Sequence, residues 1–143
     1  MHPHAPRAIL AASLVLFLLC LTQDGFVVDG DNPRAWSQAG YLLLLGWLGL
    51  LAGIVAWLAN PVLIAAWIAF ALRSHRAALA LGIAALLCAL SFLAVDTVMV
   101  SEAPSFAKVT GLGLGYWLWI ASMAVLAAGS ALALTAPKAG SPT

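Results

Sequence analysis

Four long runs of apolar residues dominate this sequence, and none of them contains a charged side chain. The runs cover residues 8–22, 39–72, 77–95 and 112–135. Only 8% of the residues in the chain are charged, whereas a soluble domain usually has about 25%. So little polar surface cannot solvate a globule, which excludes water-soluble and disordered proteins. We therefore expect an integral membrane protein with several helical spans.

The positions of the few charges predict the topology. We expect four spans, at about residues 8–22, 46–72, 77–95 and 112–135. With a cytoplasmic N-terminus, four of the six basic residues lie on the cytoplasmic side: Arg7, Arg73, Arg76 and Lys138. Outer loops at about 23–45 and 96–111 then contain Arg34, Lys108 and all five acidic residues, Glu102 among them. This asymmetry follows the positive-inside rule, which a fifth span would disturb.

The sequence therefore predicts an all-α fold, with one transmembrane domain over residues 1–143. We expect an antiparallel four-helix bundle with both termini in the cytoplasm. Two alternatives stay open. The first run could be a secretory signal, but no small-x-small cleavage site follows it, and we interpret it as an uncleaved span. Residues 36–49 either lie in the outer membrane interface or belong to the second span.

A row of small residues predicts how the second span packs. Its members are spaced by 3, 4, 3 and 4 residues, which puts them on one helix face: Gly46, Gly49, Gly53, Ala56 and Asn60. Lipid gives helices no hydrophobic reason to associate, so small residues must allow close approach. We expect one continuous helix over residues 46–60 and a kink at Pro61. The alternative is that Gly and Ala are simply frequent in such proteins.

The third and fourth spans carry similar rows of small residues. They are Ala77, Ala80, Ala84, Cys88 and Ser91 in the third span, and Gly115, Ser122 and Gly129 in the fourth. Asn60 is the one amide at membrane depth. We expect its side chain to satisfy backbone groups freed by Pro61, or to bridge to Ser91 or Ser122.

The aromatic residues fall into two groups. Trp57 and Trp67 lie deep in the second span and are expected to fill the gap that a kink opens. The others lie near the outer boundary, as in the aromatic belt of membrane proteins: Trp36, Tyr41, Tyr116, Trp117 and Trp119.

The residues that usually carry chemistry are missing from the spans. No Asp, Glu, Lys, Arg or His lies in the middle of a span, which argues against proton-coupled transport. No Ser or Thr has a basic partner at matching depth, and the two cysteines form no Cys-x-x-Cys pair. The net charge of +1 offers no field for nucleic acid. We expect no enzyme activity, no cofactor and no metal site.

Three segments carry a resemblance to a known group. They are residues 46–49, the Trp-Leu-Ala-Asn-Pro segment 57–61, and Gly-Leu-Gly-Tyr-Trp-Leu-Trp-Ile-Ala-Ser at 113–122. In these segments the chain resembles a widespread group of small bacterial multi-pass membrane proteins with no established activity. The resemblance covers residues 40–122 and implies no function. We place the protein in the bacterial inner membrane.

Two functions follow as hypotheses. The first is a non-catalytic accessory or immunity-type protein that acts through helix or loop contacts with a membrane protein or a second copy of itself. The alternative is that an apolar ligand or lipid binds in, or passes through, a cavity beside the Asn60-Pro61 kink. The residues expected to contact a ligand or partner are Trp57, Trp67, Tyr116, Trp117, Trp119 and Ser122.

Overall fold

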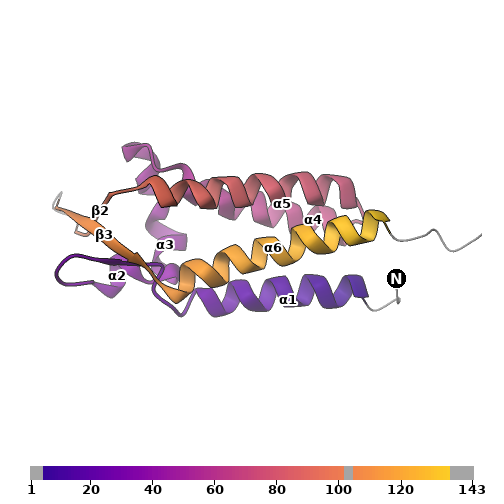
Figure 1. Ribbon diagram of the computed structural model, residues 1–143, viewed down its shortest axis with the longest axis horizontal. Helices are drawn as coiled ribbons and strands as arrows, with labels where there is room; N and C mark the ends of the chain where they lie inside the picture. The colour runs from indigo at the N-terminus through magenta and orange to yellow at the C-terminus, as the bar shows by residue number, and fades with distance from the viewer. Residues whose placement is uncertain (1–4, 102–104, 136–143) are drawn as a thin grey trace, which may run out of the picture.

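Four helices form the body of the protein in the computed structural model, which describes residues 5–101 and 105–135 (Figure 1). They are α1 (Ala5–Cys20), α4 (Ala59–Ala71), α5 (His75–Leu90) and α6 (Leu114–Thr135). Helix α6 packs against α1 and α5, and α4 packs against α5. Successive helices of the four run in opposite directions, so the beginning of α1 and the end of α6 lie at the same end of the bundle. The fold is mostly helical, as the sequence predicts.

Two of the described helical segments are long and apolar enough to cross a membrane. They are residues His75–Ala94, where the 3₁₀ turn η3 (Ser91–Ala94) continues α5, and Leu114–Thr135, which is α6. Helices α1 and α4 are shorter, with 16 and 13 residues. At about 1.5 Å per residue, α4 is only about 20 Å long. It therefore cannot match the length of α6.

Small residues line the contact between α5 and α6. The buried face of α5 consists of Ala78, Gly82, Ala85 and Ala89. A Cβ on Gly82 would lie 3.3 Å from the Cβ of Ala127, so the two backbones approach closely. The row expected in the third span, which begins at Ala77, was wrong because the buried face is rotated by one residue. In α6 the expected Gly115, Ser122 and Gly129 are all buried.

The expected continuous helix over residues 46–60 was wrong. Helix α3 (Ala39–Leu45) leads into the 3₁₀ helix η1 (Gly46–Ala52), a second 3₁₀ helix η2 (Val55–Leu58) follows, and α4 begins at Ala59. Gly53 ends η1 in the left-handed conformation with φ of +79°, and Ile54 is extended. Glycine adopts this conformation without strain, which makes it a common helix end. The five small residues therefore do not share a helix face.

Pro61 does not lie in the middle of an α-helix, as the expected kink requires. Pro61 lies in the first turn of α4, three residues into the helix. Backbone N–H groups in a first turn have no partner within the helix, so a proline there removes no hydrogen bond. The Asn60-Pro61 pair therefore lies just after the point where the 3₁₀ helix η2 passes into α4.

A small sheet occupies the two outer loops, so the fold is not all-α. Strands β1 (Phe26–Val28), β3 (Phe106–Leu112) and β2 (Thr97–Met99) lie side by side in that order and are antiparallel. Val98 pairs with Ala107, and Val27 pairs with Gly111. A short helix α2 (Arg34–Ser37) follows β1. The strands are rich in Val, Thr and Phe, which suit a pleated surface, and this signal could have predicted them.

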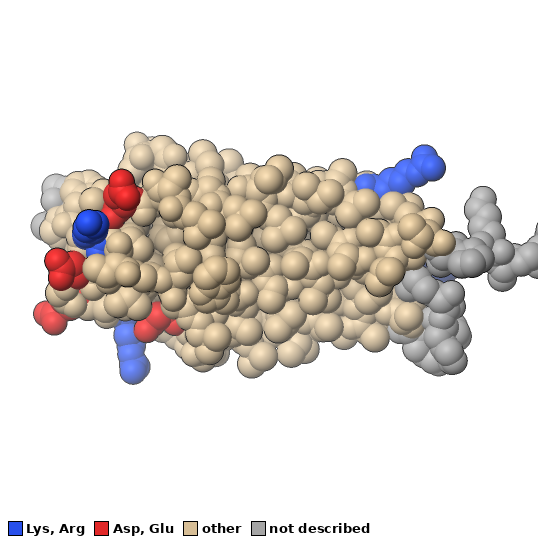
Figure 2. All heavy atoms as spheres, in the orientation of Figure 1, with Lys and Arg blue, Asp and Glu red and all other residues tan. Residues whose placement is uncertain are grey.

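Charged side chains gather at the two ends of the bundle (Figure 2). In the view of Figure 2 all acidic side chains lie at the end that holds the sheet, together with some basic ones. Arg73, between α4 and α5, and Arg76, in the first turn of α5, lie at the opposite end. Glu102 and Lys138 lie outside the described residues. The separation of charge along the bundle agrees with the predicted topology.

The sheet is tied to the bundle where β3 turns into α6. The Gly113 N–H donates to the Gly25 carbonyl at 3.0 Å, and the Gly115 N–H donates to the Asp24 carbonyl at 2.9 Å. A Cβ on Gly113 would overlap the Asp24 carbonyl group. These contacts explain why the segment begins with Gly-x-Gly.

Replacing Gly113 by Ala should loosen this junction. The added methyl group must push the backbone at Asp24 away, and overpacking of this kind costs about 1–3 kcal/mol of unfolding free energy. Gly111→Ala is the matched control, since nothing lies within 4 Å of its added Cβ, and it should change stability by less than about 0.5 kcal/mol. Denaturant unfolding in detergent, followed by circular dichroism, measures both. An equal loss of unfolding free energy in the Gly113→Ala and Gly111→Ala variants would contradict the role given to Gly113.

Candidate ligand cavity

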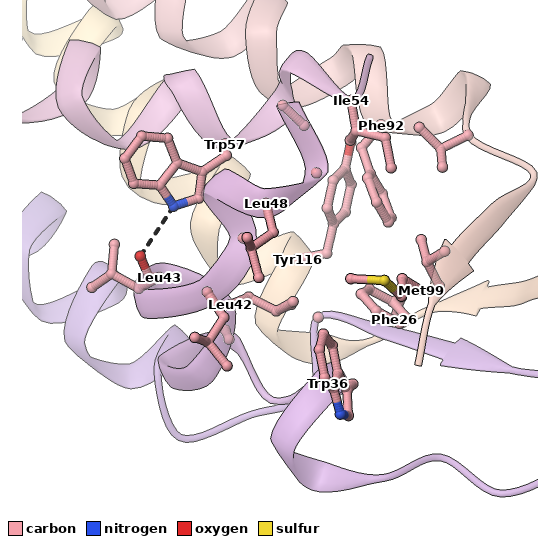
Figure 3. Close-up of a pocket in the computed structure, with 18 of the residues that line it drawn as sticks. Phe26, Trp36, Leu42, Leu43, Leu48, Ile54, Trp57, Phe92, Met99 and Tyr116 are labelled. Atoms are coloured by element: carbon pink, nitrogen blue, oxygen red, sulfur yellow. Dashed lines mark hydrogen bonds between the residues drawn. The ribbon is translucent and has the colours of Figure 1, made fainter. Parts of the chain in front are cut away.

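A cavity of about 840 Å³ lies between the end of the helical bundle and the sheet. Its walls come from the end of α1, the segment 35–60, the sheet, and the beginning of α6. Figure 3 labels ten of the residues around it, nearly all of them apolar: Phe26, Trp36, Leu42, Leu43, Leu48, Ile54, Trp57, Phe92, Met99 and Tyr116.

The segment 46–58 forms one wall of this cavity. The Trp57 Nε1–H donates to the Leu43 carbonyl at 3.0 Å, a bond drawn in Figure 3. A Cβ on Gly46 would lie 2.8 Å from Trp57 Cδ1, so only glycine lets the indole lie this close. A Cβ on Gly49 would lie 3.4 Å from the Ile54 Cβ, which is an ordinary van der Waals contact. Both of these expected packing glycines therefore pack within the segment 46–58 and not against another helix of the bundle.

Asn60 lies where the bundle meets the cavity. Only 8% of its surface is exposed, and it lines the cavity. The Trp119 Nε1–H donates to Asn60 Oδ1 at 3.0 Å. The expected bridge from Asn60 to Ser91 or Ser122 does not form. Those two hydroxyl groups donate to carbonyls of their own helices, at Cys88 and Trp119.

Trp67 lies deeper in the bundle, outside the cavity. Its Nε1–H donates to Ser13 Oγ at 2.8 Å, and the Ser13 hydroxyl donates to the Ser122 carbonyl at 2.8 Å. The Trp67 ring meets Phe17 edge to face, with centroids 5.1 Å apart. These bonds join α1, α4 and α6, so Trp67 and Ser122 hold helices together. Pro61 is exposed and does not line the cavity.

Aromatic rings form a continuous wall on one side of the cavity. The Phe26 and Phe92 ring centroids are 5.6 Å apart, and those of Phe92 and Tyr116 are 6.0 Å apart. Tyr116 is buried, and its hydroxyl donates to the Ala89 carbonyl at 3.2 Å. Trp117, next in the chain, is 53% exposed on the outside of α6. Tyr116 therefore belongs to the cavity, and Trp117 fits the expected aromatic belt.

The cavity lining is poor in charge. Among the lining residues that the structure describes, Asp96 is the one charged residue, and no His, Lys, Arg or Glu occurs. In the same part of the chain, no group of three or more His, Cys, Asp or Glu residues could hold a metal ion. The arrangement suits a largely neutral, apolar molecule.

Sequence reasoning found Asn60, Trp57, Tyr116 and Trp119 but missed the far side of the cavity. The missed residues come from strands β1 and β2 and from the end of α5: Phe26, Val98, Met99 and Phe92. Without the sheet, no pattern in the sequence indicates that residues 26–28 lie near residues 97–99 in space. Their Val and Phe content, unusual for solvated loops, was the available signal.

No protein-family model, no curated protein and no solved structure matches this chain. The resemblance to small bacterial multi-pass proteins therefore stays a prediction. The function has to be argued from the cavity itself.

The bond between Trp119 and Asn60 can be tested by removing the indole. Trp119→Phe leaves Asn60 Oδ1 without its donor, which should cost about 1–2 kcal/mol of unfolding free energy. The same substitution at Trp117, whose side chain is half exposed, should cost less than about 0.5 kcal/mol. Denaturant titration in detergent compares the two variants. A larger loss of unfolding free energy for Trp117→Phe than for Trp119→Phe would contradict the role given to the Trp119–Asn60 bond.

Proposed function

We propose that this protein binds an apolar, lipid-like ligand in the cavity between its helical bundle and its sheet. The cavity itself is the observation that carries the proposal. Its volume of about 840 Å³ lies within the range of about 300–1,000 Å³ that is usual for small-molecule sites. Its lining combines many apolar side chains with a few polar groups, Asn60 and Tyr116 among them.

The proposed setting is the bacterial inner membrane, crossed by all four helices of the bundle. The outward faces of these helices carry large exposed apolar side chains, such as Leu18, Ile68, Leu87 and Leu132, which suits contact with lipid. In the proposed orientation Arg73 and Arg76 face the cytoplasm. The cavity and the sheet then lie at the outer side of the membrane.

The ligand is proposed to enter from the outer leaflet, past the segment 46–58. The outward side of this segment carries exposed apolar residues: Trp47, Leu51, Val55 and Leu58. Such a surface is favourable at the level of the lipid chains and unfavourable in water. An apolar ligand could then reach the cavity without crossing the aqueous phase.

Binding is proposed in place of catalysis because, among the described lining residues, no hydrogen bond joins a nucleophilic side chain, Cys20 or Thr97, to the carboxylate of Asp96. Contact with a membrane-protein partner is not the function we favour. That hypothesis depended on a row of small residues along one helix, and Gly46 and Gly49 pack against Trp57 and Ile54 of the same segment.

Filling the cavity should remove binding. Leu48 lines the cavity, and Leu48→Trp should weaken retention of a radiolabelled long-chain fatty acyl methyl ester at least about tenfold. The larger ring would occupy the volume that the ligand needs. Equilibrium retention by the purified protein in detergent measures the effect.

Leu44→Trp is the control for this experiment. Leu44 is 69% exposed on the outside of α3 and does not line the cavity, so its substitution should leave retention within about twofold of the wild type. The proposal fails if the wild type retains no ester, or if Leu48→Trp and the wild type retain it equally.

A further inference from the structure

We infer that the ligand carries a carbonyl oxygen, which accepts a hydrogen bond from the Asn60 side-chain amide. The inference rests on the proposed function and deepens it by naming a chemical group of the ligand. It starts from the Asn60 side chain, a buried polar group in the lining of a largely apolar cavity.

The orientation of the Asn60 amide is fixed by its partner. An indole N–H can only donate, so the atom 3.0 Å from Trp119 Nε1 must be the amide oxygen. The amide nitrogen, Nδ2, is then turned away from Trp119. Rotation of the amide by 180° would place two donors against each other, so this orientation is retained.

Nδ2 is left as a donor without a partner. Within residues 5–101 and 105–135 no hydrogen bond of Nδ2 occurs, although 92% of the Asn60 surface is buried. Nδ2 is also not fully enclosed by protein atoms. The fully enclosed side-chain nitrogen and oxygen atoms without a partner in that part of the chain are Asn32 Oδ1 and His75 Nδ1. A buried donor without a partner is unfavourable, so an acceptor on the ligand would be stabilising.

A neutral carbonyl suits this position better than other acceptors. A phosphate or carboxylate would need a basic side chain, and the described lining contains none, while Asp96 would repel it. A hydroxyl group would accept from Nδ2, but it would also bring a donor of its own that needs an acceptor. A carbonyl accepts and leaves no unpaired donor. The rest of the ligand would lie along the aromatic wall of Phe26, Phe92 and Tyr116.

Two classes of membrane molecule carry such a carbonyl: fatty acyl esters and prenylated quinones. The chain allows a direct test, because Asn32 and Asn60 are its only asparagines. Selective ¹⁵N labelling of asparagine side chains therefore gives two NH₂ signals in an NMR spectrum. The Asn32→Leu variant removes one of them and assigns the other to Asn60. Asn32 does not line the cavity and reports on non-specific effects.

The labelled protein is titrated in dodecyl maltoside, a detergent without a carbonyl group. The probes are methyl palmitate, a prenylated benzoquinone, and hexadecane, which has no acceptor. Retention of each probe is measured in parallel. We expect one of the carbonyl probes to shift the Asn60 NH₂ protons downfield, with no such shift from hexadecane and none at Asn32. The probe that does so distinguishes an acyl ester from a quinone.

Two results would overturn the inference, and they can be told apart. If a carbonyl probe is retained but moves the Asn60 signals no further than hexadecane does, the inference fails and the proposed binding stands. If the protein retains none of the probes, the proposed function fails and the inference fails with it. The test needs no substitution at Asn60, so a folding defect of such a variant cannot affect the outcome.

Discussion

The unequal lengths of the helices determine the rest of this structure. Helix α4 has 13 residues and packs against α5, whose helical segment extends over residues 75–94, while α6 has 22 residues. At one end α4 therefore stops short of its neighbours. The 3₁₀ helix η2 (Val55–Leu58) extends α4 by four residues, and Gly53 and Ile54 separate it from the 3₁₀ helix η1 (Gly46–Ala52). The space left between the segment 46–58, the longer helices and the sheet is the cavity.

The sheet closes the structure at the same end. Its attachment depends on the approach of the Asp24–Gly25 backbone to Gly113 and Gly115, where any side chain on Gly113 would collide with a carbonyl group. The sheet places Phe26 and Val98 in the lining together with Tyr116. The lining is largely apolar, and the Asn60 amide, held by Trp119, is a buried polar group within it. This combination of an apolar volume and one oriented amide is typical of a binding site for a neutral molecule.

Much of the fold could be predicted from the sequence, and most of the cavity could not. The apolar runs predict the four bundle helices because each run must be buried or placed in lipid, and the rows of Gly and Ser predict the buried face of α6. The row at 46–60 was misleading, because helical spacing does not reveal that Gly53 adopts a left-handed conformation. For Pro61, the sequence does not reveal that the α-helix begins only two residues before it, directly after a 3₁₀ helix. Strands of three residues, such as β1 and β2, carry too little periodicity to predict that both pair with β3, one on each side.

The most direct test of the account is to locate a bound ligand in the cavity. Crystals grown with a fatty acyl ester brominated along its chain would allow the bromine atoms to be found by anomalous diffraction. The account predicts bromine in the space enclosed by Phe26, Leu48 and Tyr116. Bromine found only along the outer surfaces of α5 and α6, with none between the bundle and the sheet, would contradict it.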